Sequence, residues 1–189
     1  MNKDNFGKVA VLLGGTSNER EISINSGQSV LRALKRNGID AKGVDPKNDN
    51  VEQLKLFDRI FICLHGKDGE DGKIQKYLDS LKIPYTGNGA AASSLCMNKY
   101  LAKKQWAKDN VSTPLFMLAN SPDDYTILRK YFGNEFILKP ASSGSSLGVS
   151  IVKNNNDYME AFDNASKIDS TIIAETYISG NEYAIPILN

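Results

Sequence analysis

The chain has no excess of charge of either sign and no long hydrophobic run, and each absence narrows what it can be. Its 23 basic and 22 acidic residues leave a net charge of +1, so bulk charge favours neither nucleic acid nor an anionic membrane as a partner. No run approaches the roughly 18 apolar residues of a membrane span. The N-terminal residues lack the apolar segment and cleavage site of a signal peptide. We therefore expect a soluble, cytoplasmic protein.

Cysteine and histidine are also scarce. The two cysteines, Cys63 and Cys96, lie far apart among apolar or small residues, which favours two reduced, buried thiols over a disulfide. His65 is the only histidine, and no second histidine or cysteine pair stands at metal-ligand spacing. A zinc site is therefore not expected, and we predict no metal ligands in this chain.

The first part of the chain is predicted to form a small open α/β sheet. Unbroken apolar runs are typical of strands buried on both faces of a parallel sheet, and apolar residues at helical spacing predict a helix. The expected strands cover residues 8–13, 41–44 and 59–64, and the expected helices run from Ile22 to about Asn37 and from about Lys73. Ligands of such sheets bind at the carboxyl ends of the strands.

The composition changes near Ala90, and from there we predict an α+β arrangement. The expected helices cover residues 91–97, 99–110, 123–131 and 157–165, and the expected strands cover 114–118, 134–139, 170–175 and 182–189. Trp106 is placed on the apolar side of the second of these helices. An apolar strand at the end of the chain needs neighbours to pair with, so we expect the last domain to be incomplete.

The stretch from Phe136 to Ser150 is the most informative part of the sequence. An apolar strand ends on Lys139, and a loop of glycine and serine that contains Ser145 and Ser146 follows. Such a loop brings backbone N–H groups close to an anion, and the lysine adds a point charge. The pattern is typical of a cover over nucleotide phosphates, although an ordinary hairpin with a long linker would also fit. It is not a Walker loop, because no Gly-Lys-Ser/Thr opens a helix here.

Two further candidates follow the strands of the first part. Gly14-Gly15-Thr16 leads from a buried strand into a helix N-terminus, where an anion is favoured. Glu19, in the first turn, fits a capping arrangement, either Thr16 to Glu19 or Asn18 to Glu21, which the spacing favours. It could instead hold a ligand ammonium. His65 begins a turn rich in glycine and acids, and either Glu70 or Asp71 is expected to cap the next helix.

The remaining candidates lie in the second part. Lys99 and Lys139 stand among apolar or small residues and are candidates for phosphate contacts, although most lysines are simply solvated. Acids at a strand end and after a turn flank an apolar pair, and they could clasp a ribose and an adenine or lie on exposed strand positions. These residues are Glu175, Tyr177, Ile178 and Glu182.

Together the motifs resemble the D-alanine–D-alanine ligase family of the ATP-grasp superfamily. The matching runs are LLGGTSNEREIS at 12–23, HGKDGEDGKIQ at 65–75, PYTG at 84–87 and KPASSGSSLG at 139–148. The first two are specific to this family, and the last is shared more widely. The resemblance implies an N-terminal Rossmann-like substrate domain (1–94), an ATP-grasp central subdomain (95–175) and the first strands of a C-terminal subdomain (176–189).

The resemblance also implies a reaction. ATP would phosphorylate one D-alanine, and the amine of a second D-alanine would attack the D-alanyl phosphate to give the dipeptide for peptidoglycan. The site must exclude water, because an acyl phosphate hydrolyses readily. Relatives are usually homodimers, and the resemblance further implies two Mg²⁺ ions.

Individual roles are likewise implied by the resemblance. Glu19 would anchor the ammonium of the first D-alanine, against the capping preference, with His65 beside its carboxylate. Ser145 would link Glu19 to the loop, and Ser146 would lie near the second D-alanine and ATP. Lys99 and Lys139 would hold ATP phosphates. The adenosine pocket would be lined by Glu175, Tyr177, Ile178 and Glu182.

Some features depart from the family pattern. Thr176 stands where relatives often carry a lysine, and Lys76 where they usually have a small residue. The metal-binding carboxylates expected after Glu182 are missing, so we expect a fragment that is inactive by itself. The alternatives are a ligase that uses D-lactate or D-serine as second substrate, and a non-catalytic module that binds a nucleotide or amino acid.

Overall fold

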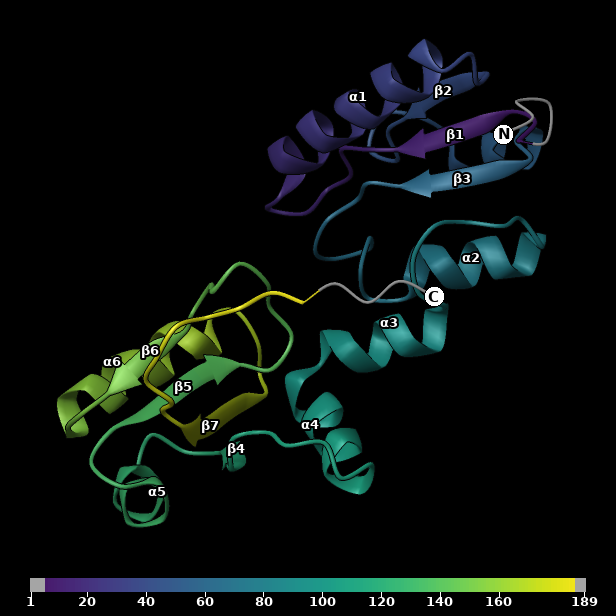
Figure 1. Cartoon of the computed structure of the whole chain (residues 1–189). Coiled ribbons are helices and arrows are strands. Elements are labelled where there is room, and N and C mark those ends of the chain that lie inside the picture. Colours follow the sequence, from purple (N-terminus) through teal and green to yellow (C-terminus); the bar gives the residue numbers. More distant parts are fainter. Residues whose placement is uncertain (1–5, 186–189) are drawn as a thin grey trace. The chain divides into compact units, whose positions relative to one another are not determined.

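The computed structural model describes residues 6–185, which fold into two compact units (Figure 1). The first unit contains the described residues up to Asn98, and the second those from Lys99 onward. Each has its own sheet and its own apolar core.

The sheet of the first unit has three parallel strands in the order β2-β1-β3. The strands are β1 (Val9–Leu12), β2 (Ala41–Val44) and β3 (Arg59–Ile62). All four residues of β1 are buried, as expected for a central strand covered on both faces. This confirms the predicted open α/β sheet.

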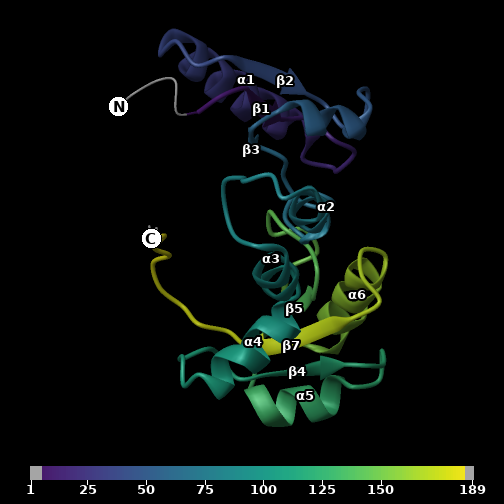
Figure 2. The ribbon, with the colours of Figure 1, turned by 90° about the vertical axis from the view of Figure 1, so that its right-hand side faces the viewer.

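Helices cover both faces of this sheet. Helix α1 (Arg20–Arg36) packs on β1 and β2, as Figure 2 shows from the side. The opposite core contains Leu12, Leu54 and Leu78, which come from β1, the 3₁₀ helix η2 (Val51–Leu56) and α2 (Lys73–Leu81). Helix α3 (Ala90–Met97) packs on α2. Among the described helices of this unit, the short η2 is the one that the sequence pattern missed.

The second unit has a four-stranded antiparallel sheet in the order β4-β7-β5-β6. Its strands are β4 (Phe116–Ala119), β5 (Phe136–Pro140), β6 (Ser150–Val152) and β7 (Ile172–Thr176). The helices are α4 (Lys99–Lys108), α5 (Tyr125–Phe132) and α6 (Asn155–Ser166). This confirms the α+β prediction.

The two faces of this sheet differ in chemistry because side chains alternate along a strand. Phe136 and Leu138 of β5 are fully buried in a core that includes residues of α5 and α6. Ile137 and Lys139 therefore point to the opposite face. In the neighbouring β7, Glu175 pairs in register with Ile137. Charged groups from two central strands thus meet on the face away from α5 and α6.

Three predictions about exposure and secondary structure are wrong. Trp106, expected on the apolar side of α4, is 41% exposed. Both cysteines are free and Cys63 is buried, but Cys96 is exposed, because α3 has no buried residue. Residues 182–185 form no strand, and residues 186–189 of that predicted strand lie outside the described part of the chain.

Among residues 6–185, no helix is both long and apolar enough to span a bilayer.

We predict that Ser23→Ala destabilises the first unit. The fully buried Ser23 hydroxyl donates to the Cys63 carbonyl at 2.6 Å and accepts from the Gly14 N–H at 2.9 Å. Its removal leaves two buried backbone groups unpaired, at a cost of about 2 kcal/mol. Amide hydrogen exchange in β1 and β3 should accelerate accordingly. The control is Ser29→Ala, at an exposed position of the same helix; equal effects of the two substitutions would contradict the prediction.

Candidate functional site

The second unit contains a cavity of about 510 Å³ on the charged side of its sheet. Its lining gathers residues from α4, β5, the β5–β6 loop and the segment after β7. Every residue predicted to bind ATP lies there, together with Ser145: Lys99, Lys139, Ser146, Glu175, Tyr177, Ile178 and Glu182. The cavity is within the size range of small-molecule sites.

The Glu175 carboxylate is held between two lysines at the base of this cavity. Its Oε1 forms an ion pair with Lys139, and its Oε2 lies 2.8 Å from Lys103 Nζ. The Glu175 side chain is only 9% exposed. Burial by itself would raise its pKa, but the two lysines outweigh burial and hold the pKa below its ordinary value. Glu175 is therefore ionised at neutral pH.

Lys99, the first residue of α4, holds the beginning of the loop that follows β5. Its backbone N–H donates to the Ala141 carbonyl at 2.8 Å. Its ammonium group donates to the carbonyls of Ser143 at 2.5 Å and Pro140 at 3.2 Å. Burial lowers its pKa, and the nearby charge of Lys139 lowers it further. Lys99 thus places a second positive charge beside Lys139 in the same cavity.

The loop from Ala141 to Val149 is organised by its own hydrogen bonds. The Leu147 N–H donates to the Gly144 carbonyl, and the Ser143 hydroxyl donates to the Leu147 carbonyl. Ser145 and Ser146 have φ angles of 50° and 56°, a left-handed conformation that is uncommon for residues with a side chain. The predicted link from Ser145 to Glu19 would join the two units and stays a prediction.

Lys103 is the residue of this cluster that the sequence analysis missed. It lies on α4 four residues after Lys99 and is 4% exposed. Its ammonium group also donates to the Thr113 hydroxyl at 2.7 Å and to the Pro114 carbonyl at 3.2 Å. Residues four apart share one face of a helix, and this spacing from Lys99 was the available signal.

The first unit places its candidate residues at the carboxyl ends of its strands. After β1, Gly14 has φ +79°, and a side chain there would come within 2.7 Å of Asp45. Asp45, directly after β2, accepts hydrogen bonds from the Gly15 N–H at 2.9 Å and from both terminal nitrogens of Arg20. The ends of β1 and β2 are thereby tied together.

Glu19 stands at the N-cap position of α1, but its side chain does not cap the helix. The predicted capping arrangement is therefore wrong. A Cβ added to Gly66 would come within 2.6 Å of Glu19 Oε2, so the carboxylate lies against the turn that follows His65. The Ser17 hydroxyl donates to the His65 carbonyl at 2.7 Å and fixes this approach. The structure therefore brings Glu19 close to the His65 turn.

The turn after β3 is held by its acidic residues. Glu70 Oε2 accepts from the Gly66 N–H at 3.0 Å, and Oε1 lies 3.4 Å from His65 Nδ1. Asp71 accepts from the Lys73 N–H at 3.1 Å. The N-cap residue of α2 is Gly72, so neither predicted acid occupies the cap position. Asp71 is the one that binds an N–H of the first turn.

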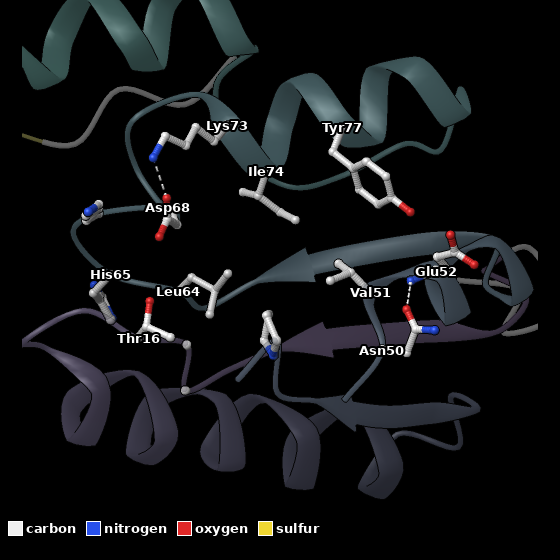
Figure 3. A pocket seen from close by; sticks show the side chains of 14 residues that line it. Thr16, Asn50, Val51, Glu52, Leu64, His65, Asp68, Lys73, Ile74 and Tyr77 are labelled. Carbon is white, nitrogen blue, oxygen red and sulfur yellow. Dashed lines mark hydrogen bonds and ion pairs between the residues drawn. The ribbon is translucent and has the colours of Figure 1, made fainter. Parts of the chain in front are cut away.

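A cavity of about 530 Å³ opens at this edge (Figure 3). Ile74 and Tyr77 of α2 point toward Leu64 and Val51 on the opposite wall. The polar lining includes Gly15, Thr16, Asp68, Lys73 and His65. Glu19, the predicted ammonium anchor, is not among its lining residues.

Within residues 6–185, no group of three or more His, Cys, Asp or Glu side chains is arranged to hold an ion.

Two family models match different parts of the chain. The model described as the D-ala D-ala ligase N-terminus matches residues 40–88, and the D-ala D-ala ligase C-terminus matches residues 121–189. The D-alanine–D-alanine ligase of Dechloromonas aromatica is 44% identical over 183 residues, which are 97% of this chain and 61% of that protein. The ligase of Acinetobacter baylyi is 43% identical over 188 residues, 100% of this chain and 61% of its own length.

Solved structures give the same result. The D-alanine–D-alanine ligase of Bacillus anthracis is 31% identical with a TM-score of 0.81 over 92% of this chain and 58% of that one. A structure of the Bacillus anthracis ligase complexed with ATP is 29% identical with a TM-score of 0.78, covering 92% of this chain and 60% of that one. The chain thus spans about three fifths of the length of the relatives it matches.

We predict that low pH reduces the stability of the first unit because the Asp45 carboxylate becomes protonated. Hydrogen bonding to Arg20 lowers the Asp45 pKa from 3.8 to about 2. A carboxylate with a depressed pKa contributes stability above its unfolded pKa and loses it as the pH falls through the folded pKa. The stability difference between wild type and Asp45→Asn should therefore shrink between pH 4 and 2, by about 1 kcal/mol because solvent screens part of the interaction.

Urea unfolding followed by circular dichroism at several pH values measures this difference. Asp40→Asn, at an exposed position before β2, serves as the control. A constant difference between wild type and Asp45→Asn down to pH 2 would contradict the assignment.

Proposed function

The chain belongs to the D-alanine–D-alanine ligase family, and from this premise we propose that its second unit binds ATP. One observation carries the proposal: all seven residues predicted for ATP line a single cavity of about 510 Å³. Lys99 and Lys139 would contact the phosphates, since they supply adjacent positive charges at the loop. Glu175, Tyr177, Ile178 and Glu182 would line the adenosine part.

We propose that this ATP site serves the ligation of two D-alanines through a D-alanyl phosphate. Glu19 would hold the ammonium of the first D-alanine, and His65 would lie beside its carboxylate. The closeness of Glu19 to the turn after His65 supports this pairing. Ser145 would connect Glu19 to the loop, and Ser146 would lie near the second D-alanine. The first unit would thus act as the substrate domain.

The same proposal includes the cellular location, the oligomeric state and the metal ions. The ligase would act in the cytoplasm as a homodimer and supply the dipeptide for peptidoglycan. Two Mg²⁺ ions would accompany ATP, with ligands other than the described residues of this chain.

We predict that the chain binds ATP and that Lys139→Met weakens this binding. The substitution removes a charged contact to phosphate, which is worth about tenfold to a hundredfold in affinity. Glu175 keeps Lys103 as its partner, so the fold should persist. Isothermal titration with ATP measures the effect, and Lys130→Met, at an exposed position of α5, is the matched control. The absence of ATP binding in the wild-type chain would refute the proposed site.

A second measurement separates the ligase from a pure binding module. The chain spans about three fifths of the length of its relatives, so we expect it to bind ATP without releasing phosphate when D-alanine is added. A longer polypeptide that contains this chain should release phosphate in a D-alanine-dependent manner. If that polypeptide binds ATP but never turns over, the binding-module alternative is correct.

A further inference from the structure

Lys103 contacts Glu175, a residue of the cavity proposed to bind ATP, but Lys103 itself does not line that cavity. The cavity lining includes Lys99, Lys139 and Glu175 but not Lys103. Lys103 approaches Glu175 from α4, with its ammonium 2.8 Å from Oε2 and 5.3 Å from the centre of the Phe116 ring. Its side chain is 6% exposed. Among the residues that Lys103 contacts, Glu175 is the charged one that lines the cavity, and it is the route we consider.

The two oxygens of Glu175 have different partners. Oε1 pairs with Lys139, which lines the cavity and whose side chain is 17% exposed. Within the part of the chain that the structure describes, Oε2 has the ion pair with Lys103 as its one polar contact. Lys103 is itself fixed by Thr113 and Pro114. One carboxylate is thus shared between a fixed inner lysine and an outer lysine that a ligand can reach.

The sharing of the Glu175 carboxylate between two lysines affects how Lys139 can contact a phosphate. A buried carboxylate left without a cation is strongly unfavourable. If Lys139 were the sole partner of Glu175, turning toward a phosphate would leave Glu175 unpaired. With Lys103 in place, Glu175 keeps one cation whichever way Lys139 turns. The Lys103–Glu175–Lys139 cluster also carries one more positive than negative charge, which favours an incoming anion.

We propose that Lys103 is a positioning residue that retains Glu175 and thereby frees the Lys139 ammonium to bind a nucleotide phosphate. The proposal rests on the ATP site proposed above and assigns a role within it to a residue that does not touch the ligand. It also explains why a lysine is buried on α4 at this point. A purely structural position would be served as well by an apolar side chain, which avoids the desolvation of a charge.

The test compares ATP with adenosine, which lacks phosphates, by isothermal titration. Lys103→Met should lower the affinity for ATP about tenfold to a hundredfold, the value of one charged contact. The affinity for adenosine should change less than about threefold, because a phosphate contact is not involved. Lys104→Met is the matched control, since Lys104 is the next residue of α4 and is exposed. It should leave both affinities unchanged.

A double substitution tests whether Lys103 influences ATP affinity through Glu175. Lys103→Met together with Glu175→Gln removes the carboxylate that would otherwise retain Lys139. In the Glu175→Gln background, Lys103→Met should therefore change ATP affinity less than about threefold. This variant contains no unpaired buried carboxylate, so it keeps the test available if Lys103→Met alone does not fold in a thermal scan.

The outcomes are distinct. Equal losses of ATP and adenosine affinity in Lys103→Met would assign Lys103 to packing and overturn the inference. An undiminished ATP affinity in that variant, or the same loss in the Glu175→Gln background, would overturn it as well. In each of these cases the wild-type chain still binds ATP and the proposed function stands. A wild-type chain that binds no ATP would overturn both.

Discussion

An ionised side chain that is removed from water must be paired, and this requirement organises the second unit. Glu175 lies on a central strand, and its carboxylate is almost entirely buried. It is tolerated because α4 and β5 each direct a lysine at it. The apolar residues of the same strands pack against α5 and α6 on the opposite face. The alternation of side chains along β5 and β7 therefore separates a core from a charged cavity.

The first unit meets the same requirement with a different set of groups. Asp45 is paired by Arg20 and by a backbone N–H of the loop after β1. Ser23 pairs the backbone of Gly14 with that of Cys63. These contacts join loops that follow three neighbouring strands, and they fix the edge where a parallel sheet binds its ligands. The polar contacts that stabilise this unit thus lie at the edge where the substrate site is proposed.

The charges of the second unit suit a polyanionic ligand better than a neutral one. Lys99 and Lys139 both line the cavity, and each is held by acceptors of the protein itself. A ligand phosphate must compete with those acceptors. The sharing of Glu175 between two lysines lowers the cost of that competition, because the buried carboxylate is never without a cation.

The sequence by itself determined most of the strands and helices, and it identified seven of the residues that line the cavity proposed to bind ATP. Periodicity and the glycine-rich motifs depend only on residues close together in the chain, so they can be recognised from the sequence alone. The tertiary structure decided what depends on distant neighbours. It exposed Trp106 and Cys96, placed Glu19 at the N-cap position of α1 without a side-chain cap, and buried Lys103 against Glu175. Those outcomes depend on which side chain another strand or helix places opposite. Lys103 and Glu175 are 72 positions apart, and no pattern in the sequence indicates that they are in contact.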